Sequence, residues 1–141
     1  MPELEILGAP QSNFVWVCRI AAAEKGVAVK LTPSRPHTPE VDAIHPSGKI
    51  PAMRHGDVTL FETLAICRYI DKAFAGPALV PADAKGAALA DQWISYVLTE
   101  VDPVMVRKFL LGYFFPGTAD GRPNRALIEP ALPAIDRKSV V

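Results

Sequence analysis

The sequence predicts an α/β domain followed by an all-helical segment, and three observations carry this prediction. The chain opens in the order strand, helix, strand, because the weakly alternating residues 4–7 precede a helical run and a second apolar stretch, residues 27–31. A short hairpin within residues 52–60 and one more helix complete this first unit. Beyond Gly76 there is no strand signal, and apolar residues recur only at helical spacing.

The sequence contains typical start and stop residues at both ends of the first helix. Ser12 and Asn13 are residue types that favour a helix N-cap, and they precede an apolar-periodic run over residues 14–25. Gly26 then ends the run. The strand that follows makes a β-α-β unit, for which we expect parallel pairing and a right-handed connection.

A proline-rich loop separates this unit from the hairpin. Three prolines keep residues 32–39 irregular, and residues 40–44 form at most one short helical turn. Residues 52–54 and 58–60 then form two strands around a tight connection, and a helix from Glu62 to Phe74 follows.

Proline and glycine mark a boundary after this helix. We expect a first domain over residues 1–76, a linker over residues 77–84 and a helical segment over residues 85–141. Within that segment, residues 85–113 have apolar side chains at helical spacing. Pro103 predicts a kink or break near Asp102.

A last helix is expected over residues 125–136.

The composition indicates a folded domain and excludes several function classes. Hydrophobic residues make up 50% of the chain and charged residues 21%, which argues against disorder. Fifteen basic and fifteen acidic side chains cancel, so charge gives no reason to expect nucleic acid or a membrane as a partner. Cys18 and Cys67 are not at metal-ligand spacing, so we expect no metal. Residues 1–5 are acidic and lack the basic and apolar regions of a signal peptide, so we expect a cytoplasmic location.

Residues 45–71 carry most of the functional signal. The segment Gly48-Lys49-Ile50-Pro51 leads into the hairpin, and the acid and hydroxyl of Glu62 and Thr63 open the next helix. A proline entering a strand beside a polar helix start suits a small peptide-like ligand, held by its backbone and its charged end.

These residues resemble the glutathione transferase family over residues 4 to about 135. The family's motif Asn-Pro-x-Gly-x-(Val/Ile)-Pro is present as residues 45–51, with His45 in place of asparagine. Its Glu-Ser motif is present as Glu62-Thr63, and Ser12 stands at the position of a serine-type active site. The resemblance is to serine-type, bacterial-like cytosolic glutathione S-transferases. It implies a thioredoxin-like α/β N-terminal domain, followed by the first helices of an all-α C-terminal domain.

The resemblance also assigns a role to each motif residue. Ser12 would donate its hydroxyl to the sulfur of glutathione, and Ile50, before a cis Pro51, would present its backbone to the cysteinyl part. Glu62 and Thr63 would bind the γ-glutamyl end. From the residues alone, the alternatives are that Ser12 or Asn13 only caps its helix, and that Glu62 and Thr63 are a first-turn acid and a cap.

Lys49 and His37 would reach the glycyl carboxylate of glutathione. For His37, a solvated loop histidine is the alternative. Trp16, Cys18 and Cys67 are interpreted as packing residues.

The family's second domain continues beyond the helices expected here, so we expect the chain to be truncated. Residues 136–141 match the translation of a common sequencing-adapter read (GAT CGG AAG AGC GTC GTG), which suggests a tail that is not biological. Different codons in the gene would refute this hypothesis, and a natural early stop is the alternative.

The resemblance implies a glutathione transferase that uses glutathione as co-substrate, acts on a small electrophile and forms a homodimer. The alternative is a non-catalytic glutathione-binding or protein-interaction module that lacks a complete electrophile site.

Overall fold

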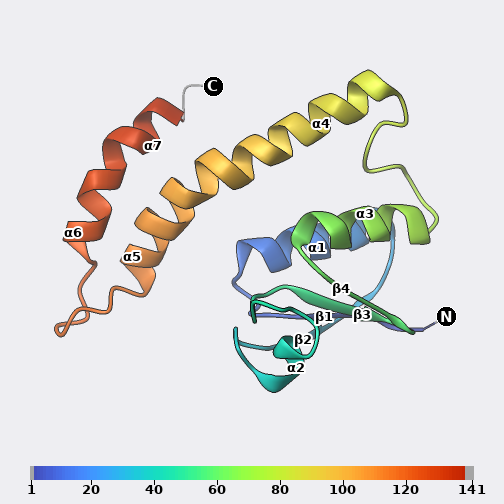
Figure 1. The fold of residues 1–141 in the computed structure, drawn as a ribbon, viewed down its shortest axis with the longest axis horizontal. Helices are drawn as coiled ribbons and strands as arrows, with labels where there is room; N and C mark the ends of the chain where they lie inside the picture. The colour runs from blue at the N-terminus through green and yellow to red at the C-terminus, as the bar shows by residue number, and fades with distance from the viewer. Residues whose placement is uncertain (1, 139–141) are drawn as a thin grey trace. The chain divides into compact units, whose positions relative to one another are not determined.

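A computed structural model describes residues 2–138 of the chain (Figure 1). The chain divides into two compact units, Met1–Val80 and Pro81–Val141. The first unit contains all of the strands found in the described residues, and the second is helical.

The first unit is built on a four-stranded mixed sheet in the order β2-β1-β3-β4. The strands are β1 (Leu4–Leu7), β2 (Val29–Thr32), β3 (Ala52–His55) and β4 (Val58–Phe61). As expected, β1 pairs parallel with β2, and it also pairs antiparallel with β3, which forms a hairpin with β4. The second strand begins two residues later than predicted, because the N–H of Val27 still donates to the carbonyl of Ala22 in the preceding helix.

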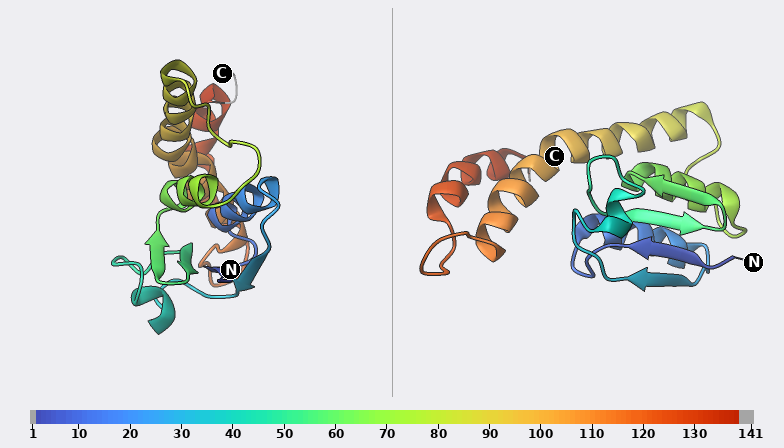
Figure 2. Two further views of the ribbon diagram at one scale, coloured as in Figure 1. Left: turned by 90° about the vertical axis from the view of Figure 1, so that its right-hand side faces the viewer. Right: turned by 60° about the horizontal axis from the view of Figure 1, so that its bottom comes forward.

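Helices cover both faces of this sheet. They are α1 (Asn13–Glu24), α2 (Pro39–Asp42) and α3 (Thr63–Ala73), and α1 and α3 lie over the same face (Figures 1 and 2). The period-2 alternation of β1 divides the core, because Ile6 faces α1 and α3 whereas Leu7 faces α2. This arrangement confirms the expected thioredoxin-like domain.

The larger part of the core lies between the sheet and the two long helices. Its buried members come from β1, β3, α1 and α3: Leu4, Ile6, Met53, Val15, Cys18, Ala22, Ile66 and Ile70. On the other face, Val41 of α2 packs against Leu7 and Ala52. The pairing of Leu7 with Ala52 in the sheet places both side chains under α2.

A buried ion pair joins the end of α1 to the end of α3. The Nζ of Lys25 lies 3.3 Å from an Oδ1 of Asp71, and both side chains are almost fully buried. Lys25 also donates to the carbonyls of Gly76 and Pro77, and Asp71 accepts the N–H of Leu79 at 2.8 Å. These bonds hold residues 76–79 against the ends of α1 and α3.

The second unit is helical, and its main helix changes its hydrogen-bonding pattern along its length. The elements are α4 (Ala84–Tyr96), the π-helix η1 (Val97–Leu110), α5 (Leu111–Phe114), α6 (Arg125–Ile128), the 3-10 helix η2 (Glu129–Ala131) and α7 (Leu132–Lys138). Asp83 caps α4 by accepting the N–H of Gly86, and Asn124 caps α6 by accepting the N–H of Leu127.

The sequence predicted a kink or a break near Asp102, and the helix does not break there. The chain continues helically through Pro103 because η1 has the wider i→i+5 pattern, which moves the proline ring away from the carbonyl that it would meet in an α-helix. Arg107 follows Asp102 by five residues and donates to its carboxylate at 2.9 Å, as the π-helical spacing allows.

The last predicted helix is also divided differently. A 3-10 turn interrupts residues 125–136, and Pro130 lies within it. The final helix reaches Lys138, so it includes three of the six residues that were expected to be a foreign tail. Residues 139–141 lie outside the described residues. Within residues 2–138, no helix is both long and apolar enough to cross a bilayer.

Candidate functional site at one edge of the sheet

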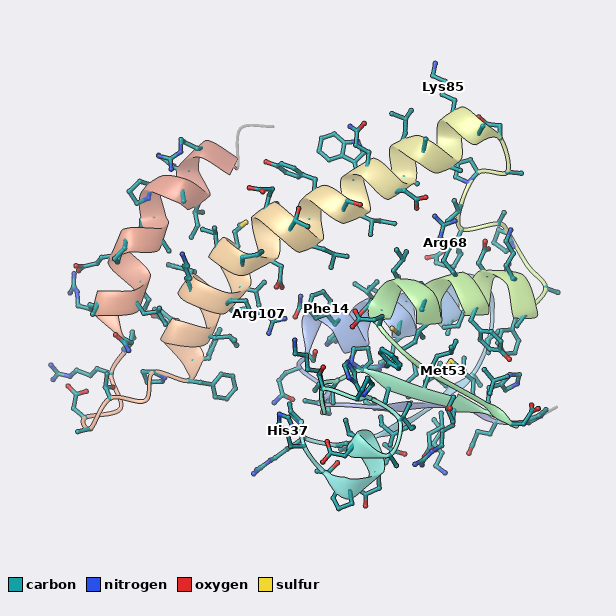
Figure 3. All side chains as sticks on the ribbon, in the orientation of Figure 1. Phe14, His37, Met53, Arg68, Lys85 and Arg107 are labelled. Carbon is teal, nitrogen blue, oxygen red and sulfur yellow. The ribbon has the colours of Figure 1, made fainter. Side chains whose placement is uncertain are left out.

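The sheet topology brings the predicted site residues to one edge. Strands β1, β2 and β4 run in one direction and β3 in the other. Ser12 follows β1 and His37 follows β2, whereas residues 49–51 precede β3 and residues 62–63 follow β4. All of these positions therefore lie at the same end of the strands, and Figure 3 shows His37 and Phe14, two residues after Ser12, at this end of the first unit.

Ser12 occupies the N-cap position of α1 with an extended backbone, but its side chain makes no capping bond. Its carbonyl accepts the N–H of Trp16, and its N–H donates to the carbonyl of Ala9, so the backbone is fixed. The residue is half-buried, and its hydroxyl forms no hydrogen bond within residues 2–138. The first turn of α1 contains no acidic residue, so no carboxylate there neutralises the positive end of the helix dipole.

The Ile50–Pro51 peptide bond is cis, as the sequence motif predicted. Gly8, which follows β1, allows Ile50 and α1 to pack close to the backbone, because a Cβ at Gly8 would overlap Val15 and lie 3.4 Å from Ile50. Among the described residues, the backbone groups of Ile50 have no recorded hydrogen bond. They are therefore available to pair with an extended peptide.

His37 contacts Gly48, the residue that precedes Lys49. The N–H of His37 donates to the carbonyl of Gly48 at 2.8 Å, and Gly48 has a φ of 58°. The His37 ring and the carboxylate of Asp42 occupy the space that a side chain at position 48 would need. His37 and Asp42 are both exposed, with 3.7 Å between the ring Nδ1 and the carboxylate, and Lys49 is also exposed.

Glu62 and Thr63 begin α3. The pairing of Ala52 with Phe61 in the hairpin places Glu62 beside the start of β3. Glu62 has a φ of 68°, a conformation that costs a non-glycine residue about 1–3 kcal/mol and that concentrates at functional sites. Its side chain is largely exposed.

His45, for which no role was predicted, is buried next to this site. Its Nε2 lies 3.9 Å from an Oε1 of Glu62, although the two residues belong to separate loops. The available signal was the histidine that replaces asparagine at the start of the proline motif. Its contact with Glu62 depends on the hairpin register and could not be inferred from spacing.

The cysteines are placed as the sequence analysis expected. Both are free, Cys18 is buried, and Cys67 packs against the same core. A hydrogen bond with Cys67, together with burial, raises the pKa of the Cys18 thiol. A thiol of this kind is a poor nucleophile, so Cys18 is a packing residue. Trp16, in contrast, is half exposed, with the guanidinium of Arg19 over its ring, so it is not a core residue.

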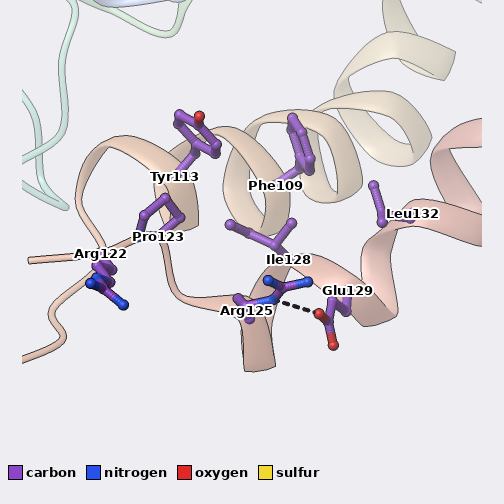
Figure 4. Close-up of a pocket in the computed structure, with 8 residues that line it drawn as sticks. All are labelled: Phe109, Tyr113, Arg122, Pro123, Arg125, Ile128, Glu129 and Leu132. Carbon is purple, nitrogen blue, oxygen red and sulfur yellow. Dashed lines mark hydrogen bonds and ion pairs between the residues drawn. The ribbon is translucent and has the colours of Figure 1, made fainter.

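A separate hollow of about 420 Å³ lies in the second unit (Figure 4). Phe109, Tyr113 and Ile128 give it an apolar wall, and Arg125 and Glu129 form an ion pair of 2.7 Å at its border. None of the residues that the resemblance assigns to glutathione lines it. Residues 2–138 contain no group of three or more His, Cys, Asp or Glu side chains that could hold a metal ion.

Comparison with known proteins gives one family. Residues 6–78 match the model of the family described as "Glutathione S-transferase, N-terminal domain", which is more than half of the chain. Similar curated proteins include glutathione S-transferase 1 of Dianthus caryophyllus, with 30% identity over 72% of this chain and 48% of that protein. Glutathione S-transferase 3 of Zea mays is 39% identical over 67% of this chain and 45% of its own length. The chain thus spans about half the length of the curated relatives that it matches.

Solved structures of similar fold extend the likeness to the second unit. Glutathione transferase F7 from Populus trichocarpa has a TM-score of 0.82 at 25% identity, and it covers 95% of this chain and 66% of that one. The theta class glutathione S-transferase from Xanthomonas axonopodis pv. citri, solved with glutathione bound, has a TM-score of 0.82 at 29% identity, covering 96% and 66%.

Proposed function

We propose that this chain, which belongs to the glutathione S-transferase family, binds glutathione at the sheet edge of its first unit and activates the thiolate of glutathione for attack on a small electrophile. The observation that carries this proposal is the convergence of the seven predicted site residues at one end of the sheet. Within residues 2–138, the Ser12 hydroxyl and the Ile50 backbone groups among them form no hydrogen bond.

Binding would proceed along the whole tripeptide. Ile50 would pair its N–H and carbonyl with the cysteinyl residue, as an added strand does, and the cis bond to Pro51 would turn those groups toward the ligand. Thr63 and the start of α3 would receive the γ-glutamyl carboxylate, and Glu62 its ammonium group. Lys49 and His37 would face the glycyl carboxylate.

Ser12 would then act on the sulfur. A thiol with a pKa near 8.5 is mostly protonated at pH 7, and lowering that pKa by two units requires about 2.7 kcal/mol. A hydrogen bond to a charged acceptor contributes about 1.5–3 kcal/mol. The N-terminus of α1 adds about 0.3–1 kcal/mol. Together these contributions are sufficient for a shift of two units in the pKa of the thiol. The alternative that Ser12 only caps its helix is weakened, because its side chain makes no capping bond.

Within the family, we place the chain among the serine-type members because Ser12 stands at the start of α1. The named curated relatives are plant proteins, and the Xanthomonas structure represents the bacterial members to which the sequence resemblance pointed. We further propose a cytoplasmic homodimer with glutathione as co-substrate and without a metal, and light scattering of the purified chain tests its oligomeric state.

A second candidate is a glutathione-binding or protein-interaction module without turnover. It is favoured by the position of the proposed contacts, all of which lie in the first unit and need no side chain from the second. One experiment separates the two functions: retention of the purified chain on immobilised glutathione, measured together with conjugation of a generic electrophile such as a chlorodinitrobenzene. Retention with turnover supports the transferase, retention alone supports the module, and failure of the chain to be retained overturns both.

A further inference from the structure

His45 is a buried polar side chain whose surroundings fix its position in the loop before β3. It is only 5% exposed. Its N–H donates to the carbonyl of Val41, and its own carbonyl accepts the N–H of Gly48, both at 2.8 Å. The backbone on which the ring is mounted is therefore held from both directions.

The orientation of the ring is fixed as well. Its Nδ1 accepts the backbone N–H of Ser47 at 3.1 Å, and the ring packs against that of Phe61, tilted by 42°, with 4.8 Å between the ring centroids. Because Nδ1 is an acceptor, the proton of the neutral ring is carried by Nε2. The ring therefore carries one N–H donor, and the Oε1 of Glu62 lies 3.9 Å from the nitrogen that bears it.

Glu62 gains from such a donor because little else orders its carboxylate. Its side chain is 69% exposed, whereas that of His45 is 6% exposed, so a buried donor lies near an exposed acceptor. Holding one long side chain in a single rotamer costs conformational entropy, and a group ordered before binding avoids that cost when the ligand arrives.

We propose that His45 is a positioning residue, whose Nε2–H holds the Glu62 carboxylate in the orientation that receives a primary ammonium group of the ligand. The separation of 3.9 Å is longer than a direct hydrogen bond, so the proposal requires the exposed Glu62 side chain to move toward the ring when the ligand binds. This inference rests on the proposed binding of glutathione, whose γ-glutamyl end carries that ammonium group. It adds a requirement on the ligand: the contribution of His45 exists only for ligands with the amine.

His45→Asn is the test variant because an asparagine amide accepts the Ser47 N–H but is too short to reach Glu62. Calorimetry on the full chain measures the affinity for glutathione and for glutaryl-cysteinyl-glycine, which is glutathione without its α-amino group. We expect His45→Asn to weaken glutathione binding about 3- to 10-fold, the range of one net hydrogen bond, and to leave the affinity for the analogue unchanged. In a Glu62→Ala background, which removes the acceptor, His45→Asn should have no further effect.

Equal losses for both ligands, or losses that add in the double variant, would overturn the inference and leave the proposed function intact. If the unsubstituted chain binds neither ligand, the proposed function itself fails. A measurement on the unsubstituted chain covers the case in which the variant does not fold: the imidazole ¹⁵N spectrum should show the Nε2–H tautomer, with a shift that glutathione changes and the analogue does not. The Nδ1–H tautomer, or equal responses to both ligands, would overturn the inference.

Discussion

At the scale of single residues, the Ser12 hydroxyl is the group whose removal separates chemistry from binding. We expect Ser12→Ala to lower the turnover number about 10- to 150-fold, the range of one hydrogen bond to a charged acceptor, while the affinity for glutathione changes little. Steady-state kinetics with glutathione and a generic electrophile measures the first quantity, and calorimetry the second. Ser34→Ala is the matched control, because Ser34 is also a half-buried loop serine but donates to the carbonyl of Thr32. Equal losses in turnover and binding would mean that Ser12 serves only the structure of its helix.

Gly48 gives a second prediction at this scale. An alanine there must adopt a φ of 58° and also overlap His37 and Asp42, so we expect Gly48→Ala to lower the free energy of unfolding by about 2–3 kcal/mol and to weaken glutathione binding. Gly26→Ala is the control: its φ is 68°, but no atom lies within 4 Å of the added Cβ, so it should cost only about 1 kcal/mol. Denaturant unfolding of both variants measures the difference, and similar costs would show that the His37 loop moves aside freely.

The structural features that the sequence predicted and those that it missed differ in a physical way. The cis bond at Pro51 followed from a motif contained in seven consecutive residues. The contact of His45 with Glu62 is created by the register of β3 against β4 and by the Ser47 bond that turns the ring, neither of which is encoded by spacing. Local chemistry was therefore predictable, and contacts between loops were not.

At the scale of elements, the same distinction appears in the helices. The sequence predicted α1 and α3 to within a residue or two, and Gly26, with a φ of 68°, ends α1 by a purely local effect. Pro103 also acts locally, but the helix continues through it because the fourteen residues of η1 have π-helical hydrogen bonds. Hydrophobic spacing does not reveal such a change in hydrogen bonding.

The ion pair between α1 and α3 provides the prediction at this scale. Asp71→Asn leaves Lys25 buried without a counter-charge, so we expect a loss of about 3–5 kcal/mol in the free energy of unfolding at pH 7. Glu3→Gln is the matched control, because it breaks a pair with the same 3.3 Å separation between exposed side chains, for which the loss should be at most about 1 kcal/mol.

The effect of Asp71→Asn should depend on pH in one direction. The N–H of Leu79 and the ammonium of Lys25 hold the pKa of the Asp71 carboxyl below its ordinary value. A lowered pKa in the folded state stabilises the protein above the unfolded value of about 3.9, and that contribution is lost as the pH falls through the folded value. The difference between the variant and the unsubstituted chain should therefore be full at pH 6–8 and shrink below about pH 4. A difference that grows in acid would contradict this assignment.

At the scale of the whole molecule, the two units differ in how much apolar surface each buries. Of the fourteen buried hydrophobic residues identified in the described chain, twelve belong to the first unit, and only Ile128 and Ala131 belong to the second. Large apolar side chains of the second unit, among them Trp93, Phe114 and Phe115, are about half exposed or more. Since burial is the main source of stability, the first unit should hold most of it.

Hydrogen exchange tests this difference. The amides of β1 and β3, which are the central strands, should exchange only through global opening of the first unit, whereas those of α4 and η1 should exchange about 100-fold faster or more, through local opening. Glutathione at 100 times its dissociation constant should slow the globally exchanging amides by a further factor of about 100, because it binds only the folded first unit. The amides of α4 and η1 serve as the internal control, since no proposed glutathione contact involves them. Equal protection in both units would show that the second is stabilised by something other than its own core, and slowing confined to α4 and η1 would move the glutathione site away from the sheet edge.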